Sequence, residues 1–135
     1  MKINIEQEIP IQRISDLLCG AFEGGSNYWY RIEEFVKPEN FDNTPDKDDR
    51  RFRHLSFPTN KGGALVISTV AADGEPEDDE ELVTYRLDLD AIERGLKFMA
   101  ISYPRHFSDF MKEDDDSDTS DVFLQCCLFG KTVYG

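Results

Sequence analysis

Cysteine, histidine and tryptophan are scarce in this chain of 135 residues, which has three, two and one of them. The cysteine count is odd and Cys126 and Cys127 are adjacent, so we expect no disulfide framework and a reducing compartment. With so few histidines and no Cys-x-x-Cys pair, we predict no metal and no cofactor. The sequence also lacks a long apolar run and a signal-like start, which predicts a cytoplasmic protein without a membrane segment.

Positive charge is also in deficit, because 15 Lys and Arg face 28 Asp and Glu for a net charge of −13. Seven of the acids lie in residues 73–81 and six in residues 113–121, and neither segment contains a base. Removing these thirteen acids leaves fifteen acids against fifteen bases. The excess charge is therefore confined to two segments, and an acidic chain of this kind is not expected to bind nucleic acid directly.

The stretch 121–130 is apolar on every side when wound as a helix, and such a helix must be buried. Thr119 and Ser120 are suitable N-cap residues, Asp121 suits the positive end of the helix dipole, and Gly130 suits the left-handed end. We therefore predict a buried C-terminal helix at 120–129 as the element that organises the core.

The remaining pattern predicts one α+β domain spanning residues 1–135, with an antiparallel sheet of three to five strands and helices packed on one face. Residues 2–9 suggest a short strand or an extended segment, and residues 51–57 suggest a further strand or an irregular segment. The other predicted elements are strands near 28–37, 64–71 and 81–87, and helices near 11–23, 89–102 and 104–112.

A glycine-rich and aromatic turn between the first helix and the first strand is one candidate ligand site. Freed backbone amides could hold a phosphate and an aromatic face could stack on a base, so sequestration of a small nucleotide is one hypothesis. The structural alternative is a helix stop followed by an aromatic strand, because glycines after a helix C-terminus lie at the wrong end of the dipole for an anion. The turn comprises Gly24, Gly25, Ser26, Asn27, Tyr28 and Trp29.

An enzymatic function is not predicted, because no nucleophile stands near His54 or His106 in a recognisable motif. The acids at 114–118 alternate as in a calcium loop, but Thr119 stands where that loop needs glycine and Gln125 where it needs glutamate.

The acidic segments are the feature that most favours a specific function. Carboxylates at alternate positions of an extended chain lie about 6 to 7 Å apart, which is similar to the spacing of phosphates. We therefore expect the segments to imitate nucleic acid and to bind a basic protein, although a purely solvating role is the simpler alternative. The predicted contact residues are Glu75, Glu77, Asp78, Asp79, Glu80, Glu81, Asp114, Asp115, Asp116 and Asp118.

Four stretches near the ends of the chain are distinctive: Asp16-Leu17-Leu18, Ala21-Phe22-Glu23-Gly24-Gly25-Ser26-Asn27-Tyr28-Trp29, Asp121-Val122-Phe123-Leu124-Gln125 and Phe129-Gly130-Lys131-Thr132-Val133-Tyr134-Gly135. In these stretches the chain resembles a family of small acidic, uncharacterised proteins encoded by bacteriophages and prophages. The resemblance implies a phage accessory protein that works in the cytoplasm of a bacterial host. Small acidic phage proteins of this kind include noncatalytic anti-CRISPR and anti-restriction inhibitors that mimic DNA, so the expected partner is a basic, nucleic-acid-binding host protein.

Overall fold

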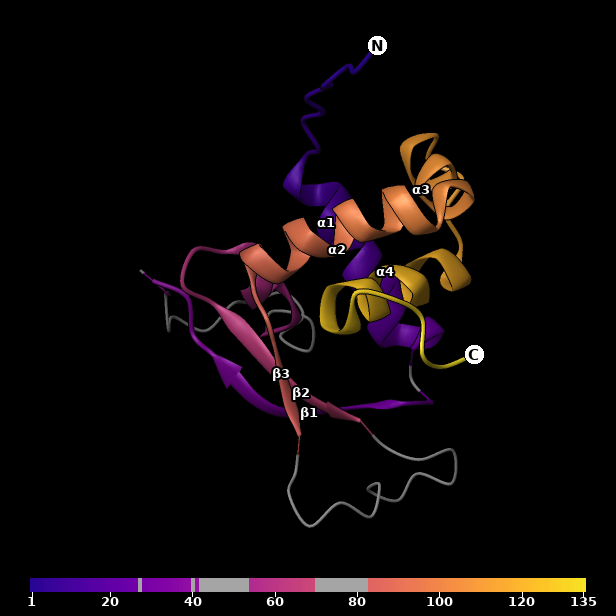
Figure 1. Cartoon of the computed structure of the whole chain (residues 1–135). Helices are drawn as coiled ribbons and strands as arrows, with labels where there is room; N and C mark the ends of the chain where they lie inside the picture. The colour runs from indigo at the N-terminus through magenta and orange to yellow at the C-terminus, as the bar shows by residue number, and fades with distance from the viewer. Residues whose placement is uncertain (27, 40, 42–53, 70–82) are drawn as a thin grey trace.

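Among the residues that the structure describes, three strands form an antiparallel sheet with helices on one face (Figure 1). The computed structural model of the chain describes residues 1–26, 28–39, 41, 54–69 and 83–135. The strand order is β1-β2-β3, with β1 at Tyr30–Val36, β2 at Ala64–Thr69 and β3 at Thr84–Leu87. The predicted α+β class is confirmed.

The helical segments follow the predicted order. They are α1 at Ile11–Gly20, its continuation as a π-helix η1 at Ala21–Gly25, a 3-10 helix η3 at His54–Thr59, α2 at Leu89–Ser102, α3 at Pro104–Met111 and α4 at Ser117–Phe129. A strand at 51–57 was one of two predictions for that region, and it is wrong for the described part, since η3 begins at 54. Pro58 lies within η3, and proline has no backbone N–H to donate in a sheet.

The central strand β2 pairs on both sides, which fixes the register of the sheet. Its Ile67 lies opposite Ile32 of β1 and opposite Tyr85 of β3. Ile67 belongs to the core and Ile32 packs against it, while the Tyr85 ring contacts the Phe129 ring of α4. A bulge between Ile32 and Glu34 shifts the register of β1. The antiparallel pairing of β2 with β3 is confirmed, while the connecting residues 73–81 lie outside the described residues.

Helix α4 lies in the middle of the helical layer and packs against α1, η1, α2, α3 and β3. Phe123 and Leu124 are completely buried in its centre. A glycine on α2 allows a very close approach, because a Cβ added at Gly95 would lie 2.7 Å from Cys127 Cα and 2.8 Å from its nitrogen. The prediction that this helix is buried in the core is confirmed.

The C-terminal end of α4 agrees with the prediction, whereas its N-terminal end does not. Gly130 ends the helix in the left-handed conformation with φ of 75°, as expected. The helix begins at Ser117, and its N-cap is Asp116, whose carboxylate accepts a hydrogen bond from the Thr119 amide at 3.0 Å. The prediction of Thr119 or Ser120 as the cap is therefore wrong, because both are buried inside the first turn.

Candidate functional site

The acidic turn between α3 and α4 is folded by hydrogen bonds of its own backbone. The Asp114 amide donates to the Asp109 carbonyl at 2.8 Å, and the Glu113 amide donates to the Phe110 carbonyl at 3.1 Å. This pair of bonds is the Schellman motif, which closes a helix through one residue in the left-handed conformation. Here that residue is Glu113, with φ of 62°, where glycine is the usual choice.

Two of the acids in this turn accept hydrogen bonds that hold the fold together, and Glu113 also lies 3.9 Å from the Arg13 guanidinium. Asp115 accepts a hydrogen bond at 2.7 Å from the guanidinium of Arg13 on α1. The same guanidinium donates to the Phe110 carbonyl at 2.6 Å and lies over the Phe110 ring. The hydrogen bond to Asp115 raises the pKa of Arg13 above its ordinary value. The other acid is the cap of α4, Asp116, and the Thr119 amide lowers the pKa of its carboxyl.

The remaining acids of the turn face solvent. Glu113, Asp114 and Asp118 are exposed, whereas Asp115 is half-buried in its ion pair. Of the predicted contact residues in this segment, Asp114 and Asp118 are therefore free to meet a partner, and Asp115 and Asp116 already have structural partners. The predicted residues Glu75, Glu77, Asp78, Asp79, Glu80 and Glu81 lie outside the described residues.

The other candidate site, the turn at 24–29, is hydrogen-bonded to a buried carboxylate on α4, that of Asp121. Asp121 accepts hydrogen bonds from Ser26 Oγ at 2.7 Å, from Tyr28 OH at 2.8 Å and from Trp29 Nε1 at 2.7 Å. Ser26 and Trp29 are completely buried. Because an ionised carboxylate can only accept hydrogen bonds, it suits a position where three donors converge.

Aromatic packing occupies the indole of Trp29. Its ring stacks on Tyr134 with centroids 5.3 Å apart and planes at 3°, and it also lies 5.4 Å from the Phe129 ring. Because both neighbours pack against the Trp29 ring, a base could stack on it only if the turn first moved away from them.

The neighbouring Tyr28 is also tied to the fold: burial, together with the hydrogen bond to Asp121, raises the pKa of Tyr28 to about 12.

The glycines of this turn also show how closely it packs on α4. A Cβ at Gly25 would collide with the Ser117 carbonyl, while a Cβ at Gly24 would meet nothing within 4 Å. Asn27 lies outside the described residues. The turn thus resembles the predicted helix stop more than a ligand cradle, since its donors and its buried aromatic ring are used inside the fold.

A buried glutamine on α4 holds the C-terminal segment in place. Gln125 Oε1 accepts hydrogen bonds from the amides of Val133 and Tyr134 at 2.7 and 2.8 Å, and its Nε2 donates to the Tyr134 carbonyl at 3.1 Å. Neither Gln125 nor Arg13 was identified from the sequence as important, and Asp121 was assigned to the helix dipole, although it lies beyond the first turn of α4. The available signal was two polar side chains, at 121 and 125, within the otherwise apolar stretch 121–129.

Histidine and cysteine chemistry is limited in the part of the chain that the structure describes. His106 Nδ1 shares a hydrogen bond with Thr119 Oγ1 at 3.0 Å. Burial raises the pKa of Cys126 to about 11 and the pKa of Cys127 well above its ordinary value, which keeps both as thiols. Among the described residues, no three side chains of the metal-binding types come together, and no helix is both long and apolar enough to span a membrane.

Comparisons with protein families, with curated proteins and with solved structures found no match to this chain.

Proposed function

We propose that the protein is a noncatalytic inhibitor that presents its acidic segments to the nucleic-acid-binding surface of a basic protein. The resemblance to phage proteins suggests the setting, namely an anti-CRISPR or anti-restriction inhibitor in the bacterial cytoplasm. Such a protein would compete with DNA by mimicking its phosphates.

The observation that carries this proposal is the confinement of the whole charge excess to two segments. A localised field of one sign steers association with a surface of opposite sign and discriminates against other partners. Acids kept only for solubility need no such confinement, because charge of mixed sign spread over the surface serves that purpose.

The α3–α4 turn adds a geometric argument for the described segment. Its backbone is fixed by the Schellman motif, by the Arg13 ion pair and by the Asp116 cap, so the exposed carboxylates of Asp114 and Asp118 start from a constrained position. A constrained loop loses less conformational entropy on binding than a free one. This argument favours a binding role over simple solvation.

The two acidic segments join different parts of the fold. Residues 73–81 connect β2 to β3, and Figure 1 shows α3 well away from the end of the sheet where β2 ends and β3 begins. The described acidic turn thus lies away from the end of the sheet at which the chain leaves β2 and enters β3.

A tagged pull-down from nuclease-treated bacterial lysate tests the proposal. We expect a nucleic-acid-binding protein to be retained at low salt and released at high salt, because screening weakens contacts between exposed charges. If no such protein is recovered at either salt concentration, the proposal is contradicted and the acidic segments serve only to solvate the protein.

Neutralised variants make the test specific to the segments. The binding variant replaces Glu77, Asp78, Asp79, Asp114 and Asp118 by Gln or Asn, and it retains Asp115 and Asp116 because both stabilise the fold. A matched control removes the same number of charges from exposed acids elsewhere, at Glu23, Glu34, Glu39, Asp90 and Glu93. Retention should be lost in the first variant and kept in the control, with similar melting temperatures for both.

A further inference from the structure

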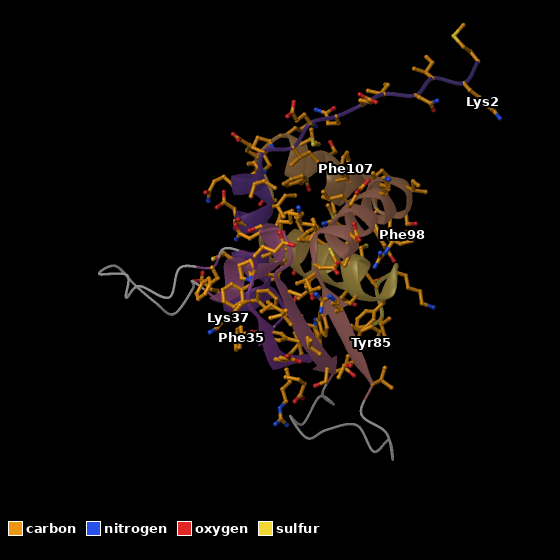
Figure 2. The ribbon with its side chains drawn as sticks, turned by 90° about the vertical axis from the view of Figure 1, so that its left-hand side faces the viewer. Lys2, Phe35, Lys37, Tyr85, Phe98 and Phe107 are labelled. Atoms are coloured by element: carbon orange, nitrogen blue, oxygen red, sulfur yellow. The ribbon has the colours of Figure 1, made fainter. Side chains whose placement is uncertain are left out.

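The first nine residues form an extended arm that leaves the body of the protein (Figures 1 and 2). The arm makes no hydrogen bond or ion pair with the described part of the chain. Two of its three isoleucines are strongly exposed, Ile3 at 70% and Ile5 at 80%, whereas Ile9 packs against the core. The exposed extended arm therefore presents two large aliphatic side chains to solvent, together with backbone N–H and C=O groups that a second strand can pair with.

The arm is complementary to a second copy of itself in antiparallel orientation. When two arms pair about Asn4, Ile3 of one lies opposite Ile5 of the other, and Lys2 lies opposite Glu6 at both ends. Residues directly opposite each other in an antiparallel pair point to the same face. All four isoleucines therefore gather on one face, and two pairs of opposite charge lie on the other.

We propose that two copies of the protein associate through these arms, as a two-stranded antiparallel ribbon with its twofold axis at Asn4. The contact is isologous, since each arm offers the same surface that it receives. The parallel alternative places Lys2 against Lys2 and Glu6 against Glu6, and like charges opposite each other destabilise a strand pair. This proposal is independent of the acidic segments.

The surface at the base of the arm is of mixed polarity, so the ribbon must be stabilised mainly by its own side chains. An isolated two-stranded ribbon is only marginally stable in water. A hollow of about 240 Å³ lies between the arm and α3, and its lining combines the apolar Ile9, Pro10, Phe110 and Met111 with the charged Glu8, Arg13, Lys112 and Glu113. Ile11 and Met111 are also exposed nearby, at 53% and 38%. The four isoleucines of the ribbon therefore supply the apolar contact between the copies themselves, and we expect a weak, concentration-dependent dimer.

The intermolecular arrangement is favoured over an arm that folds back onto its own chain. A reversal at Glu6 and Gln7 would carry Ile3 and Ile5 back over the hollow, but neither residue is typical of a turn. Antiparallel pairing with a second copy needs no reversal, because the arm is already extended.

Sedimentation equilibrium of the whole chain over a concentration series, at physiological salt, tests the pairing. The wild type should show a monomer–dimer equilibrium. Lys2→Glu and Glu6→Lys should each raise the dimer dissociation constant by about tenfold or more, because each single change places like charges opposite each other at both ends. The double variant should restore dimerisation, as should an equimolar mixture of the two single variants. Lys131→Glu, an exposed change of the same charge outside the arm, is the control for net charge.

Cross-linking tests the register separately. Asn4→Cys should form a disulfide-linked dimer under mild oxidation, because position 4 lies opposite itself, while Lys2→Cys should not. A wild type that remains monomeric at every concentration would overturn the proposal. So would single variants that dimerise as well as the wild type, or cross-linking at position 2 that equals cross-linking at position 4.

Discussion

At the scale of single residues, Asp121 joins three donors that are more than ninety positions away in the sequence. A charge placed in a protein interior is tolerated when hydrogen bonds replace its hydration. Here the bonds also fix the position of the first strand relative to α4, because Ser26, Tyr28 and Trp29 lead directly into β1. The carboxylate therefore acts as a structural link between the two ends of the chain.

Asp121→Ala should lower the free energy of unfolding by about 3 kcal/mol or more, because it leaves buried donors on Ser26 and Trp29 without an acceptor. Asp118→Ala, one turn earlier on the exposed side of α4, should cost less than about 0.5 kcal/mol. Urea denaturation of both variants measures the difference. Equal stabilities would show that the hydrogen bonds to Asp121 contribute little.

Glu113→Gly should raise the free energy of unfolding by about 0.5 to 1 kcal/mol, because glycine adopts the left-handed conformation of this position without the steric cost that a Cβ imposes. Asp114→Gly, the adjacent change at a position with ordinary φ, should not stabilise the protein. Thermal melts of the two variants provide the comparison. A lower melting temperature for Glu113→Gly would mean that the Glu113 side chain matters more than its backbone.

At the scale of elements, α2 and α4 are in such close contact that a glycine-to-alanine change on α2 is expected to destabilise the protein, which is the opposite of its usual effect in a helix. Replacing a helical glycine by alanine normally stabilises a helix by about 1 kcal/mol. Gly95→Ala should instead destabilise the protein by about 1 to 3 kcal/mol, since the added methyl group would meet the backbone of Cys127. Gly24→Ala, which has open space around its Cβ, should be neutral or stabilising. Denaturant titrations that rank the two variants in the opposite order would contradict this packing.

The cap of α4 predicts a dependence of stability on pH. Asp116→Ala should cost about 1 kcal/mol at pH 7, whereas Asp116→Asn should cost less, because asparagine also caps helices. The hydrogen bond from Thr119 lowers the pKa of Asp116 in the folded state, so its charge stabilises the fold above the unfolded pKa, near 3.9, and this contribution is lost as pH falls.

The stability difference between wild type and Asp116→Ala should therefore narrow from pH 7 to about pH 2.5. Chemical denaturation at a series of pH values measures it. A difference that stays constant or widens toward acid would rule out the charge of Asp116 as its source.

The elements could largely be predicted from the sequence because their signals are local. Apolar spacing located α1, α2 and α3, and the all-round apolar run located α4. The start of α4 could not be predicted, because residues 114–121 offer several equally good caps in a row. Tertiary contacts decide among them: Ser120 packs against Gly20, and Ser117 packs against Gly25. The hydrogen bonds of Asp121 could not be predicted from the sequence either, since its partners are far away along the chain.

At the scale of the whole molecule, the buried polar groups and the exposed acids have different roles. The polar groups within the helical layer, at Arg13, Asp121 and Gln125, are all used to hold the chain together. The described acids left for a partner in the α3–α4 turn are on the surface, where each contributes little alone. Any binding that they support must therefore come from their number and placement, and it must depend strongly on salt.

If the protein mimics nucleic acid, the partner must bind either this protein or nucleic acid but not both at once. Neither a solvating role nor binding at another surface has this consequence. The direct measurement is a competition titration, in which the purified partner is bound to a labelled duplex and the protein is added. We expect complete displacement of the duplex by the wild type, displacement by the control with neutralised acids elsewhere, and none by the variant neutralised at Glu77, Asp78, Asp79, Asp114 and Asp118. A stable ternary complex of protein, partner and duplex would contradict the proposed function.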